Sequence, residues 1–269
     1  MLRKLLKYEL KSTSRILLPL YGALLIFAFI LKIFIGSKLD GVNMDFLGGI
    51  PAVISIFTYG ATMAAVFIVT IFIIMQRFYK NLLGDEGYLM NTLPVSTNLN
   101  ICSKLIAAIF WSLISIFIAG LSILIMVYNP DVFKEFWPNL YMLLSKAHSE
   151  FGFSFTIIII EFILAGLLQL ALNITLIYAS ISIGHLLPKM KILGAFGAFI
   201  VLNIIMNTIL SIVVFLAPSS VIDYINLLSQ SNTTFIHLLG ISGILINAFW
   251  FGIYYFITRY ILKNKLNLE

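Results

Sequence analysis

The sequence predicts an all-α membrane protein with six transmembrane helices, an amphipathic interfacial helix at the N-terminus, and both termini in the cytoplasm. The first observation is composition. Of the 269 residues, 61% are apolar and only 10% are charged, against roughly 45–50% and about 25% in soluble domains. The others are six long apolar runs and a one-sided distribution of Lys and Arg. So few charged residues cannot cover a soluble surface, so a soluble globular protein is excluded.

The apolar runs define the spans, because a transmembrane helix needs about 20 mostly apolar residues. The six runs are 16–35, 50–75, 101–127, 155–187, 192–217 and 235–262. They are continuous rather than alternating with a period of two, which excludes the strands of a β-barrel. The fourth run would form a helix about 50 Å long, against a hydrocarbon core of about 30 Å. We therefore expect it to tilt, break or project from the membrane.

Basic residues set the orientation. Thirteen of the 17 Lys and Arg residues fall on the side that holds both termini, and only four fall on the other side: Lys32, Lys38, Lys134 and Lys146. Cytoplasmic segments carry the excess of Lys and Arg, so this bias predicts cytoplasmic termini. The net charge of +6 is accordingly explained by topology and by contact with anionic headgroups, and not by nucleic-acid binding.

Residues 1–14 read MLRKLLKYELKSTS. Leu2, Leu5 and Leu6 fall on one face of a helix, and basic side chains lie toward the other. This pattern predicts a short amphipathic helix on the cytoplasmic leaflet. It serves either as a topology anchor alone or also as a contact for a partner protein.

The first cytoplasmic loop, residues 77–100, reads RFYKNLLGDEGYLMNTLPVSTNLN. It has more apolar and aromatic side chains than a bare connection needs, and Gly84 and Gly87 bracket the acidic pair Asp85 and Glu86. The apolar content indicates docking onto headgroups or onto a cytosolic subunit. The acidic pair argues against anionic headgroups as the only partner.

Three segments are expected outside the cell, at 37–49, 128–152 and 218–234. The last has no Lys or Arg and about half of it is apolar. We expect it to form short re-entrant helices that dip into the outer leaflet, where protein contacts satisfy the backbone.

Polar side chains inside the predicted spans are the candidate transport residues. Glu161 is the only carboxylate among them, and buried charge in a membrane usually faces a bundle interior, a cavity or a partner. The candidates are Glu161, Gln169 and Asn173 in the fourth span, Asn203 and Asn207 in the fifth, and Asn247 in the sixth. They either line a translocation path or form hydrogen bonds between helices, and Glu161 alternatively reaches the headgroups.

No catalytic or metal-binding motif is present in the sequence. It contains no P-loop, no H-E-x-x-H and no G-x-S-x-G. Cys102 is the single cysteine, and His185 and His237 are separate and have no third ligand at metal spacing. We therefore expect no enzyme activity, no cofactor and no metal site in this chain.

Two stretches, residues 1–25 and 77–105, resemble the permease subunits of type-2 (type V) ATP-binding-cassette exporters, of the compact kind found in Firmicutes. The six-span architecture is similar over the whole chain. The resemblance implies that 1–14 is the elbow helix, that about 78–92 holds the coupling helix, and that 218–234 is the external re-entrant segment. It also implies a contact with a separate ATPase subunit through Leu82, Leu83, Gly84, Asp85, Glu86, Gly87 and Tyr88.

The resemblance further implies a complex in the bacterial plasma membrane. Two permease chains, identical or paralogous, would associate with two cytosolic ATPases that hold ATP and Mg²⁺. The expected activity is export of hydrophobic or amphipathic cargo, with amphipathic antimicrobial or toxin-like peptides as the best candidate. Two alternatives stay open: a secondary transporter driven by an ion gradient, and a non-transporting membrane scaffold or sensor.

Overall fold

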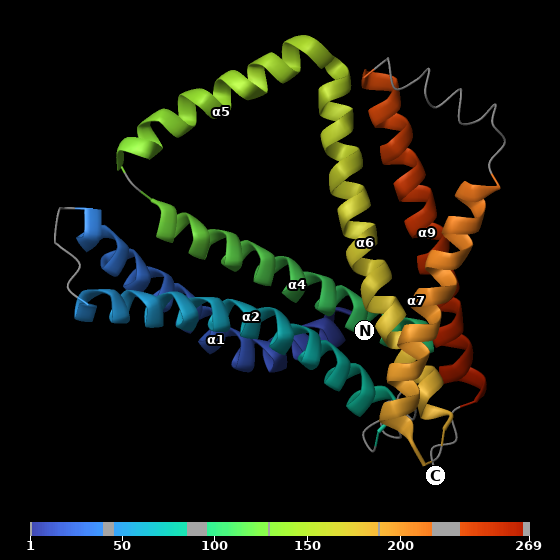
Figure 1. Cartoon of the computed structure of the whole chain (residues 1–269). Coiled ribbons are helices and arrows are strands. Elements are labelled where there is room, and N and C mark those ends of the chain that lie inside the picture. The colour runs from blue at the N-terminus through green and yellow to red at the C-terminus, as the bar shows by residue number, and fades with distance from the viewer. Residues whose placement is uncertain are drawn as a thin grey trace. The chain divides into compact units, whose positions relative to one another are not determined.

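A computed structural model describes residues 2–39, 46–84, 96–128, 130–187, 189–216 and 232–265. Across these ranges every regular element is a helix and none is a strand, which confirms the predicted all-α class (Figure 1). The helices are α1 (Leu2–Leu39), α2 (Phe46–Leu82), α4 (Thr97–Val127), α5 (Pro130–Phe151), α6 (Phe153–His185), α7 (Lys191–Phe215) and α9 (Asn232–Asn264).

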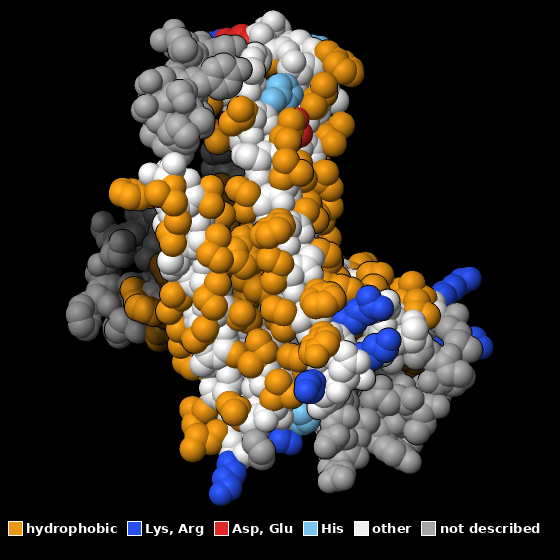
Figure 2. Space-filling view, turned by 90° about the vertical axis from the view of Figure 1, so that its right-hand side faces the viewer, with side chains coloured by type: hydrophobic (Ala, Val, Ile, Leu, Met, Phe, Trp, Pro, Cys, Tyr) orange, Lys and Arg blue, Asp and Glu red, His pale blue; other side chains and the backbone are white. Residues whose placement is uncertain are grey.

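Six of these helices, all except α5, are long and apolar enough to cross a membrane. The chain is therefore a multi-pass membrane protein, as its composition predicted. Hydrophobic side chains are spread along the helices over the face seen in Figure 2, and no residue of α7 is buried. Lipid is the solvent that such a surface requires, because helices satisfy their backbone hydrogen bonds internally and expose only side chains.

The fourth predicted span forms one unbroken helix, α6, of 33 residues. It begins and ends two residues earlier than predicted. A helix of about 50 Å is expected to tilt, break or project in order to fit a hydrocarbon core of about 30 Å. The unbroken α6 excludes a break, so the helix tilts or projects from the membrane.

The N-terminal segment differs from the expectation of a separate short helix. Residues 2–14 are helical, but they continue directly into the first span, so that α1 is a single helix of 38 residues with Pro19 inside it. At about 1.5 Å per residue, α1 is about 57 Å long. A helix of this length extends well beyond the hydrocarbon core unless it is strongly tilted.

The chain divides into two compact units, of which the first comprises Met1–Arg77 and Cys102–Asn139. Its core is a stripe along α1, spaced by steps of four and three residues: Leu17, Tyr21, Leu24, Ala28 and Leu31. This stripe packs with Tyr59, Val66 and Ile73 of α2 and Trp111 of α4. The spacing is that of one helix face, which explains why α1 buries this stripe and leaves its other faces to lipid.

Hydroxyl groups connect the helices inside this first unit. The hydroxyl of Ser115 lies 2.8 Å from that of Tyr21 and 2.9 Å from that of Thr70. The hydroxyls of Tyr59 and Ser122 are 2.9 Å apart. Such bonds between helices add directional contacts where apolar packing alone gives little preference for one arrangement in lipid.

The second unit comprises Phe78–Ile101 and Leu140–Glu269. Here α6 packs against both α7 and α9. Its core joins Leu172, Leu176 and Ala179 of α6 to Trp250 and Tyr254 of α9. The hairpin between α6 and α7 requires a glycine, because a Cβ atom at Gly184 would lie 2.3 Å from the backbone nitrogen of Ala195.

Helix α5 occupies a stretch predicted only as an external connection. It joins α4 to α6 as one 22-residue helix (Figure 1). It turns into α6 at Gly152, whose positive φ of 55° is readily adopted only by glycine.

Candidate functional site

Two regions hold the residues predicted to function: the C-terminal end of α2 with the loop that follows it, and the polar positions within the spans. At the first, α2 ends as the backbone N–H groups of Leu83 and Gly84 both donate to the carbonyl of Tyr79, each at 2.9 Å. Asp85, Glu86, Gly87 and Tyr88 lie outside the described residues, as does the rest of the loop up to residue 95.

Leu82 and Leu83 are buried, with 3% of each residue exposed. Their side chains therefore pack inside the chain and support the end of α2, and they present no surface to another subunit in this structure. The predicted contact of the loop with an ATPase stays a prediction, and it depends on residues after Gly84.

Aromatic packing holds the end of α2 within the second unit. Phe78 is fully buried and stacks on Tyr178 of α6, with ring centroids 3.9 Å apart and an angle of 10° between the planes. The rings of Tyr79 and His185 meet edge to face at 6.1 Å. On the other side of the loop, Ile101 of α4 is also fully buried. Both ends of the loop are therefore anchored in packed structure.

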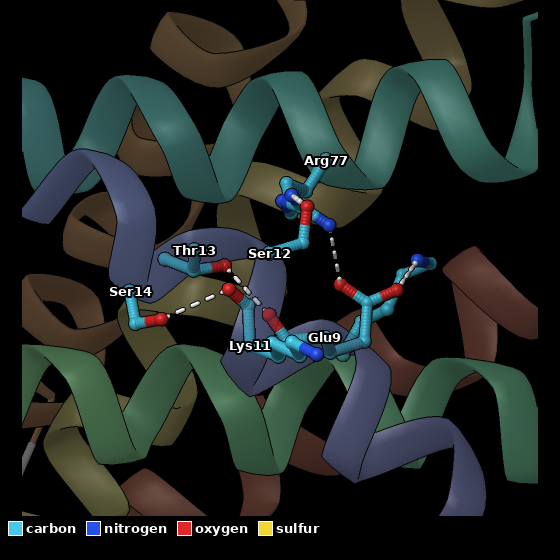
Figure 3. Close-up of polar contacts among 7 residues, drawn as sticks. Glu9, Lys11, Ser12, Thr13, Ser14 and Arg77 are labelled. Atoms are coloured by element: carbon cyan, nitrogen blue, oxygen red, sulfur yellow. Dashed lines mark hydrogen bonds and ion pairs between the residues drawn. The ribbon is translucent and has the colours of Figure 1, made fainter.

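A charged cluster in the first unit joins the N-terminal segment to the two helices that flank the loop (Figure 3). The Glu9 carboxylate accepts a hydrogen bond from the Lys104 ammonium at 2.7 Å and one from the Arg77 guanidinium at 3.3 Å. Arg77 also donates to the Ser12 hydroxyl. We call Glu9, Arg77 and Lys104 the ion cluster.

The ion cluster is largely withdrawn from solvent. The exposed fraction of the side chain is 2% for Lys104, 9% for Glu9 and 24% for Arg77. Water screens such charges weakly, so removing one partner of a buried pair typically costs about 3–5 kcal/mol. The cluster thus fixes where the start of α1 lies against α2 and α4.

The amphipathic pattern of residues 1–14 does not predict this cluster, because it places the segment on the membrane surface. One signal was present. Glu9 is the only acidic residue before position 40, in a segment that carries five Lys and Arg residues in its first 15 positions. A lone carboxylate among cations indicates a specific basic partner rather than a contact with anionic lipid.

Within the spans, the structure pairs two residues for which the sequence alone predicted no contact. Nδ1 of His237 on α9 lies 3.0 Å from both carboxylate oxygens of Glu161 on α6. Their side chains are 23% and 12% exposed. Gly240 leaves the space for this carboxylate, because a Cβ atom there would lie 2.7 Å from one of its oxygens. Glu161 therefore contacts α9. The pair could not be predicted from spacing, because its two residues are 76 positions apart in the chain.

The other predicted polar residues form contacts along single helices. Gln169 donates to the Asn173 side chain at 3.3 Å on an exposed face of α6. The Asn207 amide donates to the backbone carbonyl of Asn203 at 2.9 Å on α7. Asn247 is half-buried on α9. These two bonds do not join helices, so they do not support the interpretation as interhelical contacts.

One end of α7 has an open hollow on its exposed polar side. Asn207, Thr208 and Ser211 line it together with Ile212 and Phe215, and its volume is about 510 Å³. Exposed amide and hydroxyl groups are costly to place against acyl chains. We therefore expect this side of α7 to face a cavity or another protein surface, and not acyl chains.

The described residues contain no group of three or more His, Cys, Asp or Glu side chains placed to hold a metal ion. Comparison with known protein families, curated proteins and solved structures finds no match to this chain.

Proposed function

We propose that this protein is the permease subunit of an ATP-driven ATP-binding-cassette exporter in the bacterial plasma membrane, with both termini in the cytoplasm. The observation that carries the proposal is the anchoring of the first cytoplasmic loop. Leu82 and Leu83 before it and Asn100 and Ile101 after it are each at most 3% exposed. A subunit that pushed on this loop would act on the spans, because the residues that flank the loop on both sides are packed within the chain.

The ion cluster supports the same proposal. It joins Glu9 near the start of α1 to Arg77 at the cytoplasmic end of α2 and to Lys104 at the start of α4. A displacement of either flanking helix would therefore be transmitted to the first span. Two-state movement of the spans, biased by nucleotide on a partner subunit, requires such rigid connections.

The exposed polar side of α7 supports association with a second permease chain, identical or paralogous. No residue of α7 is buried within this chain, and Asn207, Thr208 and Ser211 lie together on its surface. In the proposed complex these residues face the second chain and the path between the two. Because the same hollow also presents Ile212 and Phe215, it suits a cargo with polar and apolar faces, such as an amphipathic antimicrobial or toxin-like peptide.

The test is recovery of the ATPase. The tagged chain, extracted from native membranes in mild detergent, should co-purify with a cytosolic ATP-hydrolysing subunit. The double variant Asp85→Lys plus Glu86→Lys should lose that subunit. The matched control, Glu135→Lys plus Glu150→Lys on α5, changes the charge equally in a segment predicted to be external and should retain it.

Failure to recover an ATPase with the unaltered chain would refute the proposal, and so would equal loss with both double variants. The path is tested separately by Asn203→Leu plus Asn207→Leu, which should abolish cargo export while the ATPase still co-purifies. Unchanged export would show that these asparagines only pack.

A second candidate function, secondary transport driven by an ion gradient, is favoured by the Glu161–His237 pair. A carboxylate and an imidazole 3.0 Å apart inside a bundle can exchange a proton, as such transporters require. It predicts transport that stops when a protonophore collapses the gradient while ATP is still present, and that is lost in Glu161→Gln. Export that continues under a protonophore would exclude it.

A further inference from the structure

Helix α5 has two chemically different faces. One face carries apolar side chains at steps of four and three residues: Phe133, Trp137, Leu140, Leu144, Ala147 and Phe151. The opposite face carries Glu135, Asn139, Lys146 and Ser149, with one apolar side chain, Met142, among them. This is the pattern of an amphipathic helix that lies at a boundary between apolar and polar surroundings.

Large aromatic side chains on α5 are uncovered. The exposed fraction is 59% for Trp137, 75% for Tyr141 and 44% for Phe136. The chain has three tryptophans, and the other two, Trp111 and Trp250, are 6% and 5% exposed. Trp137 is therefore the one tryptophan of the sequence that packing within the chain does not shield.

Several aromatic rings contact one another at the junction between α4 and α5, in the first unit. The ring of Phe133 lies 5.0 Å from that of Tyr128 and 6.0 Å from that of Trp137, and Trp137 lies 5.6 Å from Phe136. The Lys32 ammonium lies 4.4 Å above the Tyr128 ring. We call these residues the aromatic corner.

The neighbours of α5 in the chain determine what can cover its apolar face. Helices α4 and α6 are both membrane spans, and only residues 128–129 and Gly152 separate them from α5. We take the excess length of α6 as tilt, which holds both ends of α5 at the membrane boundary. Tryptophan and tyrosine concentrate at this level, where an apolar ring and a polar N–H or O–H can each be satisfied.

Charge on α5 does not indicate a strongly charged partner. Its two lysines, Lys134 and Lys146, stand against three carboxylates, Asp131, Glu135 and Glu150, so that the helix carries a net charge of only −1 with His148 neutral. Binding through apolar and aromatic insertion thus fits a phospholipid surface of any headgroup charge, including a zwitterionic one.

We propose that α5 is an interfacial helix that binds the outer leaflet, with its apolar face and the aromatic corner inserted between headgroups and acyl chains and its polar face in water. The outer side follows from the predicted topology. The proposal does not depend on an ATPase partner or on transport.

The test uses Trp137 as a depth probe. The variant Trp111→Phe plus Trp250→Phe retains it alone, and the chain is reconstituted into phosphatidylcholine vesicles with bromine atoms at a shallow or a deep acyl position. We expect blue-shifted emission, strong quenching by the shallow bromines, weaker quenching by the deep ones, and little quenching by aqueous acrylamide.

Met142 supplies a matched control, because it is 62% exposed, similar to Trp137, but lies on the opposite side of α5. Met142→Trp, in a background with all three natural tryptophans replaced by Phe, should be quenched by acrylamide and not by brominated lipid. Equal acrylamide quenching at positions 137 and 142 would overturn the proposal. Protection of Trp137 from both quenchers would also overturn it, because a protein surface would then cover the face.

The side of the membrane is tested with the single cysteine. With Cys102→Ser, Met142→Cys should react with a membrane-impermeant maleimide added to intact cells. Reaction only after the cells are opened would place α5 on the cytoplasmic side and overturn the assignment to the outer leaflet.

Discussion

Replacing Glu9 by glutamine should destabilise the chain more than replacing either of its cationic partners, Arg77 or Lys104. The substitution keeps the size and the hydrogen-bonding oxygen of the side chain but removes the negative charge 2.7 Å from the Lys104 ammonium, whose side chain is 2% exposed. It also removes the counter-charge 3.3 Å from Arg77. We expect a loss of about 3–5 kcal/mol in the free energy of unfolding, the usual cost of breaking a buried ion pair.

The two cations should differ from Glu9 and from each other. Arg77→Ala should cost about 1 kcal/mol, because its side chain is 24% exposed and the shorter pair between Glu9 and Lys104 persists. Lys104→Met should cost an intermediate amount. Adding Lys104→Met to Glu9→Gln should recover part of the stability that Glu9→Gln alone loses, since the ammonium no longer lies buried beside a neutral side chain.

The assay is the unfolding midpoint of the purified chain in mild detergent as a denaturing detergent is added, followed by fluorescence of the buried tryptophans. Glu135→Gln on α5 is the control. It removes an exposed carboxylate and should change the free energy by less than about 0.5 kcal/mol. A cost of Glu9→Gln equal to that of the control, or strictly additive costs for Glu9→Gln and Lys104→Met, would refute the assignment of a coupled buried cluster.

Two further predictions concern the second unit and use the same assay. Gly184→Ala places a Cβ atom 2.3 Å from the Ala195 nitrogen and should lower the free energy of unfolding by about 3 kcal/mol or more, because the backbone cannot move aside cheaply. The control is Gly197→Ala, whose Cβ atom meets no atom within 4 Å and which should be neutral or slightly stabilising. Equal effects of the two substitutions would contradict the close packing at Gly184. His237→Ala and Glu161→Gln should be non-additive, with a coupling of about 0.5–3 kcal/mol, since the two side chains lie 3.0 Å apart; independent effects would mean that the pair contributes nothing.

The residues that join helices show why the site was harder to predict than the fold. Glu9 and Lys104 are 95 positions apart in the chain, and Glu161 and His237 are 76 apart. No spacing in the sequence predicts either pair, because a contact between two helices depends on which of their faces pack together and on their relative shift along the helix axes. Gln169 and Asn173, by contrast, contact each other four residues apart on one helix, the kind of relation that periodicity alone predicts.

The sequence by itself determined the class of the protein and the number of its spans. Apolar runs of about 20 residues leave the backbone one way to satisfy its hydrogen bonds in lipid, which is a helix, and all six predicted runs lie on helices long and apolar enough to cross a membrane. Only the tertiary structure decided that residues 2–14 continue into the first span, that Leu82 and Leu83 point inward, and that α5 forms a two-faced helix. Burial in lipid acts on each segment separately and can be read locally, whereas the pairing of one helix with another is set by side chains far apart in the chain.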